Sequence, residues 1–236
     1  MRFPAFDVVD LSHLLEERMP VFPGDKQFKK AKDGKLEKAT GLIAHTLTLG
    51  EHVGTHIDAP LHFDATGSTV DQIPASRLVL PAVMIDVRER TLDNPEYRFT
   101  VADFFEWEEE NGWIPPHCMV VLHTGWGFRW RTDPYLGADE LGTLHFPGFG
   151  VDVAEFLAEE RSVAAIGIDT ASVDVGRSSR FPVHRSMLSR GVILVENLAN
   201  AHQLPERDFL VALGALKVKG GSGAPARVLA MIPKEE

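Results

Sequence analysis

The chain lacks the cysteine pairs, the long apolar runs and the net positive charge that are typical of proteins of oxidising compartments, membrane proteins and nucleic-acid-binding proteins. Cys118 is the single cysteine among 236 residues, which excludes an internal disulfide and favours a cytoplasmic location. No apolar run approaches the roughly 20 residues that a membrane-spanning helix needs. The formal net charge is −10, so nucleic acids and anionic membranes are poor candidate partners.

The N-terminal stretch from Met1 to Leu15 carries acidic residues and lacks a basic segment followed by an apolar one, so we expect no signal peptide. A single basic cluster, Lys26 to Lys38, is interrupted by Asp33 and Glu37 and predicts a solvated loop. The sequence has no convincing repeat and no linker rich in proline, glycine or serine. We therefore expect residues 1–236 to form one domain.

Apolar runs of strand length recur along the chain, and several are apolar on both faces, as in a sheet covered on both sides. These predicted strands are Leu42–Leu49, Val79–Val87, Met119–His123, Val163–Ile168, Val192–Val195, Leu210–Val218 and Val228–Ile232. The predicted helices are one capped by Thr100 that ends at Glu110, one over Val151–Glu160, and one from Pro182 to Gly191. This pattern predicts an α/β fold, a single domain with a mixed, barrel-like β-sheet and flanking helices.

Three histidines and an aspartate fall within eleven residues: His52, His56, Asp58 and His62. All four positions are even, so an extended chain would place the four side chains on one face. Gly54 and Pro60 would bend this strand, which helps the four groups converge. A helix would turn Asp58 away from the others, and Pro60 cannot lie in a helix interior. Convergent imidazoles and a carboxylate are ligands for Zn²⁺ or Mn²⁺, and the segment therefore predicts a metal site.

A strand cannot surround an ion, so further ligands must come from another part of the chain. Glu196 ends the apolar run Val192–Val195, where a buried carboxylate is costly unless it is paired or bound to metal. An ion pair with an arginine remains the alternative. His184 lies near the start of the helix that leads into this strand. We interpret Asp169 and Asp174 as hydrogen-bonding residues that form turns or support the ligands.

Other residues are ambiguous or unremarkable. The histidines at positions 13, 45, 117, 145 and 202 are expected to be packing or surface residues, and His123 is left undecided. Aromatic residues such as Phe22, Trp126 and Trp130 would either line a pocket for an aryl ring or belong to the core. Residues 220–223 lack the lysine and spacing of a phosphate-binding loop, which favours a turn.

The string His52-x-Gly54-Thr55-His56-x-Asp58-x-Pro60-x-His62-Phe63 resembles the signature of the cyclase family, which includes bacterial kynurenine formamidase and isatin hydrolase. Four further segments are similar and occur in the right order: Pro20–Asp25, His123–Trp126, Gly167–Thr170 and Gly221–Pro225.

The resemblance implies a metal-dependent hydrolase of an amide, imide or lactone, with a barrel-like α/β fold and a homodimeric or homotetrameric assembly. The implied metal ligands are His52, His56, Asp58, His184 and Glu196, with Asp58 and Glu196 able to bridge two ions. His62 would be the catalytic residue that transfers protons. The implied cofactor is Zn²⁺, one or two ions per chain, with Mn²⁺ as the alternative.

Two departures from the family pattern concern the small-molecule substrate. Phe22 stands where the formamidases tend to have a substrate-contacting tryptophan, and Arg185 follows His184 where a second histidine is common. The first prediction is hydrolysis of an arylformamide, such as N-formylkynurenine, by metal-bound hydroxide. The alternatives are a cyclic imide, lactam or lactone hydrolase of the isatin hydrolase type with a single Mn²⁺, and a non-catalytic metal-binding protein.

Overall fold

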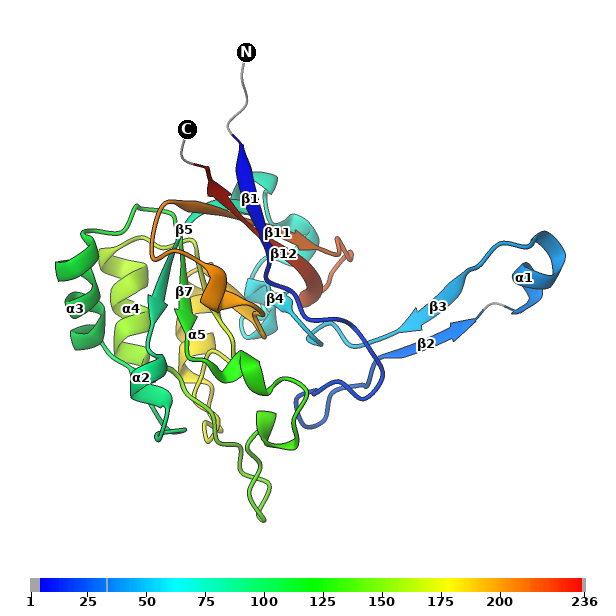
Figure 1. The fold of residues 1–236 in the computed structure, drawn as a ribbon, viewed down its shortest axis with the longest axis horizontal. Coiled ribbons are helices and arrows are strands. Elements are labelled where there is room, and N and C mark those ends of the chain that lie inside the picture. Colours follow the sequence, from blue (N-terminus) through cyan, green and yellow to red (C-terminus); the bar gives the residue numbers. More distant parts are fainter. Residues whose placement is uncertain (1–4, 33, 235–236) are drawn as a thin grey trace.

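A closed ring of hydrogen-bonded strands forms the centre of the computed structural model, which describes residues 5–32 and 34–234 (Figure 1). The order around the ring is β12-β11-β5-β7-β9-β10-β4, and β4 pairs again with β12. These strands are β4 (His56–Asp58), β5 (Val79–Asp86), β7 (Met119–His123), β9 (Ala165–Ile168), β10 (Ile193–Glu196), β11 (Phe209–Ala215) and β12 (Gly223–Pro233). Strand β1 (Phe6–Asp10) lies outside the ring and pairs antiparallel with β12.

The sheet is mixed. Strands β5, β7, β9 and β10 run parallel to their neighbours in this group, and the remaining contacts of the ring are antiparallel. The predicted α/β fold with a mixed, barrel-like sheet and flanking helices is therefore confirmed. The assignment of residues 1–236 to one domain stays a prediction.

The strands from the centre of the sequence are apolar on both faces because both faces are covered. Along β5 and β7, Met84 and Val121 belong to the core inside the barrel, whereas Val83 and Leu122 belong to a second core. That second core lies beneath the helices α3 (Val101–Asn111), α4 (Val151–Glu160) and α5 (Pro182–Ser189), which cover one side of the barrel (Figure 1).

The helix boundaries follow local sequence signals. Thr100 caps α3, and its hydroxyl accepts a hydrogen bond from the backbone N–H of Asp103, whose carboxylate in turn accepts one from the N–H of Thr100. Helix α5 begins at Pro182 and is followed by Gly191 at a φ of +74°, a conformation that glycine adopts readily. The short helix α2 (Arg88–Thr91) was not predicted.

The predicted strand Leu42–Leu49 and the predicted loop Lys26–Lys38 are both wrong in detail. Strands β2 (Lys29–Lys32) and β3 (His45–Thr48) pair with each other, and α1 (Gly34–Thr40) lies between them. Together they form an arm that projects from the barrel (Figure 1). All residues of both strands are exposed to solvent, so the lysine-rich segment is solvated, as predicted, but regular.

Short strands were also missed. Strand β6 (Arg98–Phe99) pairs with β8 (Gly148–Phe149), and both have only two residues. Strand β4, in contrast, lies within the extended segment predicted around His56 and Asp58 and has three residues. Within the described ranges, no helix has the length and apolar character needed to cross a membrane.

Replacing Thr100 with alanine should lower the free energy of unfolding by about 1 kcal/mol, because α3 then loses its N-terminal cap. Urea denaturation followed by circular dichroism measures this change. The matched variant Thr100→Ser keeps the hydroxyl and should unfold near the wild-type midpoint. Equal midpoints for Thr100→Ala and wild type would contradict the capping role.

Candidate metal centre

Strand β4 directs two of the predicted ligands to the same side of the barrel wall. The side chain of Ile57 is buried in the barrel core, so His56 and Asp58 point away from that core. Glu196 of β10 is the direct cross-strand partner of His56 and lies on the same face. Two segments 140 residues apart in sequence are thereby joined by ordinary strand pairing.

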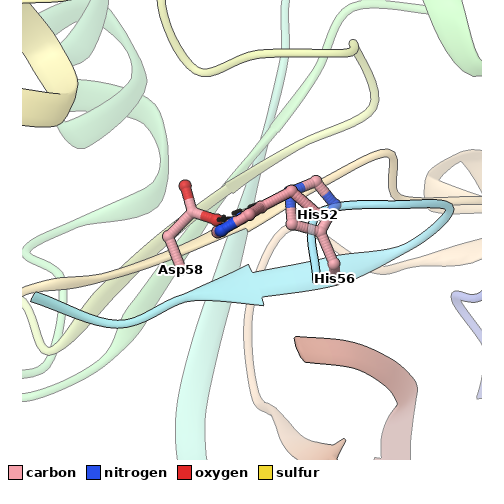
Figure 2. A group of neighbouring side chains, drawn as sticks. All are labelled: His52, His56 and Asp58. Atoms are coloured by element: carbon pink, nitrogen blue, oxygen red, sulfur yellow. Dashed lines mark hydrogen bonds and ion pairs between the residues drawn. The ribbon is translucent and has the colours of Figure 1, made fainter. Parts of the chain in front are cut away.

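The bends predicted at Gly54 and Pro60 are present in the segment from His52 to His62. Only residues 56–58 form a strand, because Gly54 turns the chain at a φ of +64° and Pro60 starts the 3-10 helix Pro60–His62. The side chains converge. His52 reaches back from the turn before β4, and Figure 2 shows its ring beside the ring of His56 and the carboxylate of Asp58.

His52, His56 and Asp58 form a tight group. The Nδ1 atom of His52 lies 2.7 Å from Oδ1 of Asp58, and Nε2 of His56 lies 3.4 Å from the same oxygen (Figure 2). One ligand atom from each of the three residues lies within 4.8 Å of the other two, a spacing that can hold a metal ion.

His184 and Glu196 extend the group on its other side. The Nε2 atom of His184, in the first turn of α5, lies 3.3 Å from Oδ2 of Asp58 and 3.1 Å from Oε1 of Glu196. The other oxygen of Glu196 lies 3.3 Å from Nε2 of His56. The five residues predicted as ligands therefore meet. No arginine among the described residues pairs with Glu196, so the arginine alternative does not hold.

Each of the three imidazoles is held by the nitrogen that points away from the carboxylates. His56 Nδ1 lies 2.9 Å from the carbonyl of Gly54, and His184 Nδ1 lies 2.7 Å from Oδ2 of Asp174. His52 Nε2 lies 2.9 Å from the hydroxyl of Ser222, which donates its single hydrogen to Glu51.

Because these outer partners accept hydrogen bonds, the outer nitrogen of each neutral ring must carry the proton. The inner nitrogen then presents a lone pair toward Asp58 or Glu196. This is the tautomer that a metal-binding histidine requires, and Asp174 and Ser222 are placed as partners that fix ring orientation. The supporting role expected for Asp174 agrees with this geometry, whereas Ser222 and Glu51 were missed.

The two carboxylates create a strongly negative environment. Burial alone would lower the pKa of His56, but hydrogen bonds to Asp58 and Glu196 outweigh burial and raise that pKa to about 10. Burial likewise lowers the pKa of His184, but the charge of Glu196 and the hydrogen bonds to Asp174, Asp58 and Glu196 together outweigh burial and raise the pKa well above the usual value. The site thus attracts positive charge, which a divalent cation supplies while leaving the imidazoles neutral.

Asp58 provides a further indication that the residues fit a cation. Its carboxylate is 1% exposed, and its Oδ2 atom forms no hydrogen bond with any described residue, although His184 Nε2 is 3.3 Å away. A buried carboxylate oxygen without a donor is costly. A metal ion shared between Asp58 and the facing imidazoles would satisfy it.

His62 lies beside this cluster on the 3-10 helix. Its ring stacks on that of His52, with centroids 3.9 Å apart, and it also lines the cavity at the site. Burial lowers the pKa of His62 to about 4. Its ligand atom also falls within 4.8 Å of Asp58 and His184, so the geometry permits metal contact as well as proton transfer.

A cavity of about 200 Å³ opens beside the cluster, and aromatic side chains form part of its wall. Phe22, Phe63 and Phe181 line it, and the ring of Phe181 lies 6.1 Å from Phe22 and 5.5 Å from Phe63. Trp126 and Trp130, the other aromatic residues considered for the pocket, do not line this cavity and are buried in the apolar cluster against which Phe22 packs. Phe63 and Phe181 were missed.

The remaining polar predictions agree with the structure. His45, His117 and His202 are exposed, His13 stacks on Trp130, and His145 pairs with Glu96. His123 is buried 3.1 Å from Asp169, whose carboxylate also accepts hydrogen bonds from Thr124. These two residues have a structural hydrogen-bonding role at the end of β7.

Gly223, at the start of β12, lies directly against the His52 ring. A Cβ atom at this position would lie 2.5 Å from Cε1 of His52 and 2.6 Å from the carbonyl oxygen of Ile57. Gly223→Ala should displace the ring and weaken metal binding at least about tenfold, measured by competition with a chelating dye. Gly34→Ala, where nothing lies within 4 Å, is the control. Unchanged affinity in Gly223→Ala would contradict the assignment of His52.

Comparison with known proteins gives a consistent result. Residues 9–175 match the family described as "Putative cyclase". Isatin hydrolase of Roseibium aggregatum is 32% identical over 197 residues, which cover 80% of this chain and 74% of that protein. Kynurenine formamidase of Bacillus cereus is 28% identical over 221 residues, which cover 94% and 95%.

Among solved structures, isatin hydrolase A of Labrenzia aggregata, bound to benzyl benzoate, matches with a TM-score of 0.92 at 32% identity. The match covers 97% of this chain and 94% of that one. This chain therefore belongs to the cyclase family and is a metal-dependent hydrolase.

Proposed function

We propose that this enzyme hydrolyses the C–N bond of a small aromatic amide, with an arylformamide such as N-formylkynurenine as the first candidate. The observation that carries the proposal is the orientation of three imidazoles, each tethered by its outer nitrogen with its inner nitrogen facing Asp58 or Glu196. The named activity of the Bacillus cereus relative supports the arylformamide.

In this proposal His52, His56 and Asp58 hold one divalent cation, and Asp58, His184 and Glu196 hold a second. Zn²⁺ is the first candidate and Mn²⁺ the alternative, because imidazole and carboxylate ligands suit both. A bound cation of this kind lowers the pKa of water to about 7 and polarises a carbonyl group. The enzyme's own residues orient the substrate and move its protons.

His62 is the proposed proton-transfer residue. It lines the cavity, and within the described part of the chain its ring nitrogens form no hydrogen bond, unlike those of the three tethered imidazoles. A histidine that is free to exchange protons can accept one from water and pass it to the leaving amine. Its stacking on His52 holds the His62 ring beside the proposed metal ligands, where the exchange would take place.

The aromatic wall supports an aryl substrate. Phe22, Phe63 and Phe181 present ring faces and edges to the cavity, which favour a flat aromatic group over a charged one. Phe181 has a left-handed backbone, with a φ of +50°, that is unfavourable for a bulky residue. Its ring lies 5.6 Å from that of His184, so this strained position joins the aromatic wall to the cluster.

A second candidate is the opening of a cyclic amide by an enzyme of the isatin hydrolase type. The TM-score of 0.92 to isatin hydrolase A favours it, as does Phe22 in place of the formamidase tryptophan. Both candidates break an amide C–N bond beside an aromatic ring. The non-catalytic alternative does not hold, because the relatives are named hydrolases.

Metal removal and a substrate panel test the proposal together. Enzyme purified without chelators should contain one or two equivalents of zinc or manganese by mass spectrometry of the metals. Dialysis against a chelator should abolish hydrolysis, and the native ion should restore it. N-formylkynurenine, formanilide and isatin form the panel. Faster hydrolysis of isatin would favour the second candidate, and inactivity of the metal-loaded enzyme on all three would overturn the proposal.

His62→Ala should keep the metal content of the wild type and lose about 100-fold or more in kcat, because a general acid–base residue contributes on that scale. The exposed histidine variant His202→Ala is the control and should keep full activity. Loss of metal from His62→Ala would instead make His62 a ligand, and normal turnover would contradict any catalytic role.

A further inference from the structure

A second cavity, of about 360 Å³, lies apart from the candidate metal centre. Its wall includes His13, Leu14, His123, Phe128 and Trp130. None of the described residues lines both this cavity and the one beside the metal centre. The proposed hydrolysis therefore gives the second cavity no role.

Three residues of this wall carry a buried side-chain nitrogen that forms no hydrogen bond within the described part of the chain. These atoms are Nε2 of His13, Nε2 of His123 and Nε1 of Trp130. Among the described residues, six buried side-chain atoms lack a hydrogen bond, so half of them belong to the wall of this one cavity. An unpaired buried polar group is costly, and this concentration of such groups indicates a ligand that supplies their partners.

The three nitrogens differ in the hydrogen bonds that they can form. Nδ1 of His123 lies 3.1 Å from Oδ2 of Asp169, a carboxylate oxygen that accepts, so Nδ1 carries the hydrogen and Nε2 of the neutral ring is an acceptor. Nε1 of Trp130 is always a donor. Burial lowers the pKa of His13 to about 4 despite the nearby charge of Asp169, so its neutral ring is an acceptor or a donor according to its tautomer.

Apolar side chains lie beside these nitrogens. The ring of Phe128 lies 6.1 Å from that of His123. Phe128 is 61% exposed and Leu14 70%, so both lie where the cavity opens to solvent, and the ring of Phe128 can turn without disturbing the core. A flat aromatic group would pack against this ring.

The charged groups of the wall have partners of their own. Arg131 forms an ion pair with Glu16 at 2.6 Å, and Asp169 accepts hydrogen bonds from the backbone N–H and the hydroxyl of Thr124. Within the described ranges, no three metal-binding atoms from this wall lie within 4.8 Å of one another. The cavity therefore favours a neutral ligand over an ion.

We propose that this second cavity binds a small, neutral aromatic molecule that carries an N–H or O–H group. The ligand donates its hydrogen to Nε2 of His123, and its ring packs against Phe128. His13 and Trp130 supply further hydrogen bonds to the polar part of the ligand. The inference goes beyond the proposed function and does not depend on the substrate of the enzyme.

Hydrogen bonds connect the second cavity with the candidate metal centre. The backbone N–H of His13 donates to Oγ1 of Thr55 at 2.9 Å, and that hydroxyl donates to the carbonyl of Asn197 at 2.6 Å. The side-chain amide of Asn197 donates to the carbonyl of Gly54, which lies 2.9 Å from Nδ1 of His56. A ligand held by His13 therefore reaches the metal centre through the backbone that orients His56, without occupying the substrate cavity.

Phenol and toluene test the proposal as a matched pair, because they differ by one hydroxyl group. Each is titrated into the metal-loaded, ¹⁵N-labelled enzyme, and NMR follows the indole N–H signals of the four tryptophans. Trp130→Phe identifies the Trp130 signal. Phenol should shift this signal at a concentration at least about tenfold lower than toluene, because toluene leaves the buried nitrogens unpaired.

Two variants test the residues of the proposed site. His123→Phe keeps a ring but removes the acceptor, and it should weaken phenol binding at least about tenfold at unchanged metal content. Phe128→Ala alters an exposed side chain, so the fold is retained, and it should weaken phenol binding at least about threefold. His45→Phe is the matched control, because His45 is exposed on β3 and lines neither cavity, and it should bind phenol as the wild type does.

Equal binding of phenol and toluene, or a Trp130 signal that neither compound shifts, would overturn the proposal. Phenol that competes with substrate and leaves the Trp130 signal in place would also overturn it, because phenol would then bind beside the metal centre. Loss of metal from His123→Phe would overturn it as well and make His123 a metal ligand. These outcomes are read from binding and metal content, so they remain distinct from any failure of the proposed hydrolysis.

Discussion

Two carboxylates buried against three imidazoles are the constraint on which the site depends. Asp58 and Glu196 are almost inaccessible to solvent, and taking a carboxylate out of water is unfavourable unless positive charge or several hydrogen bonds offset it. The protein directs imidazole nitrogens at both carboxylates and ties each ring by its opposite side. Replacing a member of this group would leave its neighbours with an uncompensated charge, so the cluster must be retained or changed as a unit.

The barrel makes this arrangement possible by joining distant parts of the chain at one short strand. Strand β4 pairs with β10, which brings Glu196 opposite His56, and with β12, which brings Gly223 opposite Asp58. Residues near positions 58, 196 and 223 therefore become neighbours through backbone hydrogen bonds alone. Helix α5 contributes His184, whose backbone N–H and ring Nδ1 are held by the carboxylate of Asp174.

Much of this could be predicted because the signals were periodic or chemically distinctive. Runs apolar on both faces gave the strands β5, β7, β9 and β10, and the even spacing of His56 and Asp58 placed them on one face of β4. Gly54 and Pro60 bend the backbone on either side of β4, as their residue types predict, and His52 and His62 converge on the strand residues. The roles of all these side chains as ligands stay predictions.

Other features left no readable signal. Ser222 and Glu51 support His52 through contacts across 170 residues, which no local pattern can reveal. Phe181 lines the cavity because its backbone is left-handed, a conformation that no sequence pattern predicts for a phenylalanine. Strand β2 of the arm was missed because it faces solvent on both sides, and so lacks the alternation of apolar and polar residues that identifies a half-buried strand, whereas β3 lies within a predicted strand.

The double pairing of β4 has a mechanical consequence. The strand is the seam at which the barrel closes, and its three residues include two members of the charged cluster. Mutual repulsion between Asp58 and Glu196 therefore acts on the seam itself, whereas a cation gathered there would draw both of its edges together. A substitution that changes the charge balance at β4 would therefore also affect the closure of the barrel. Substitutions in the surrounding loops can alter the chemistry of the site without that cost.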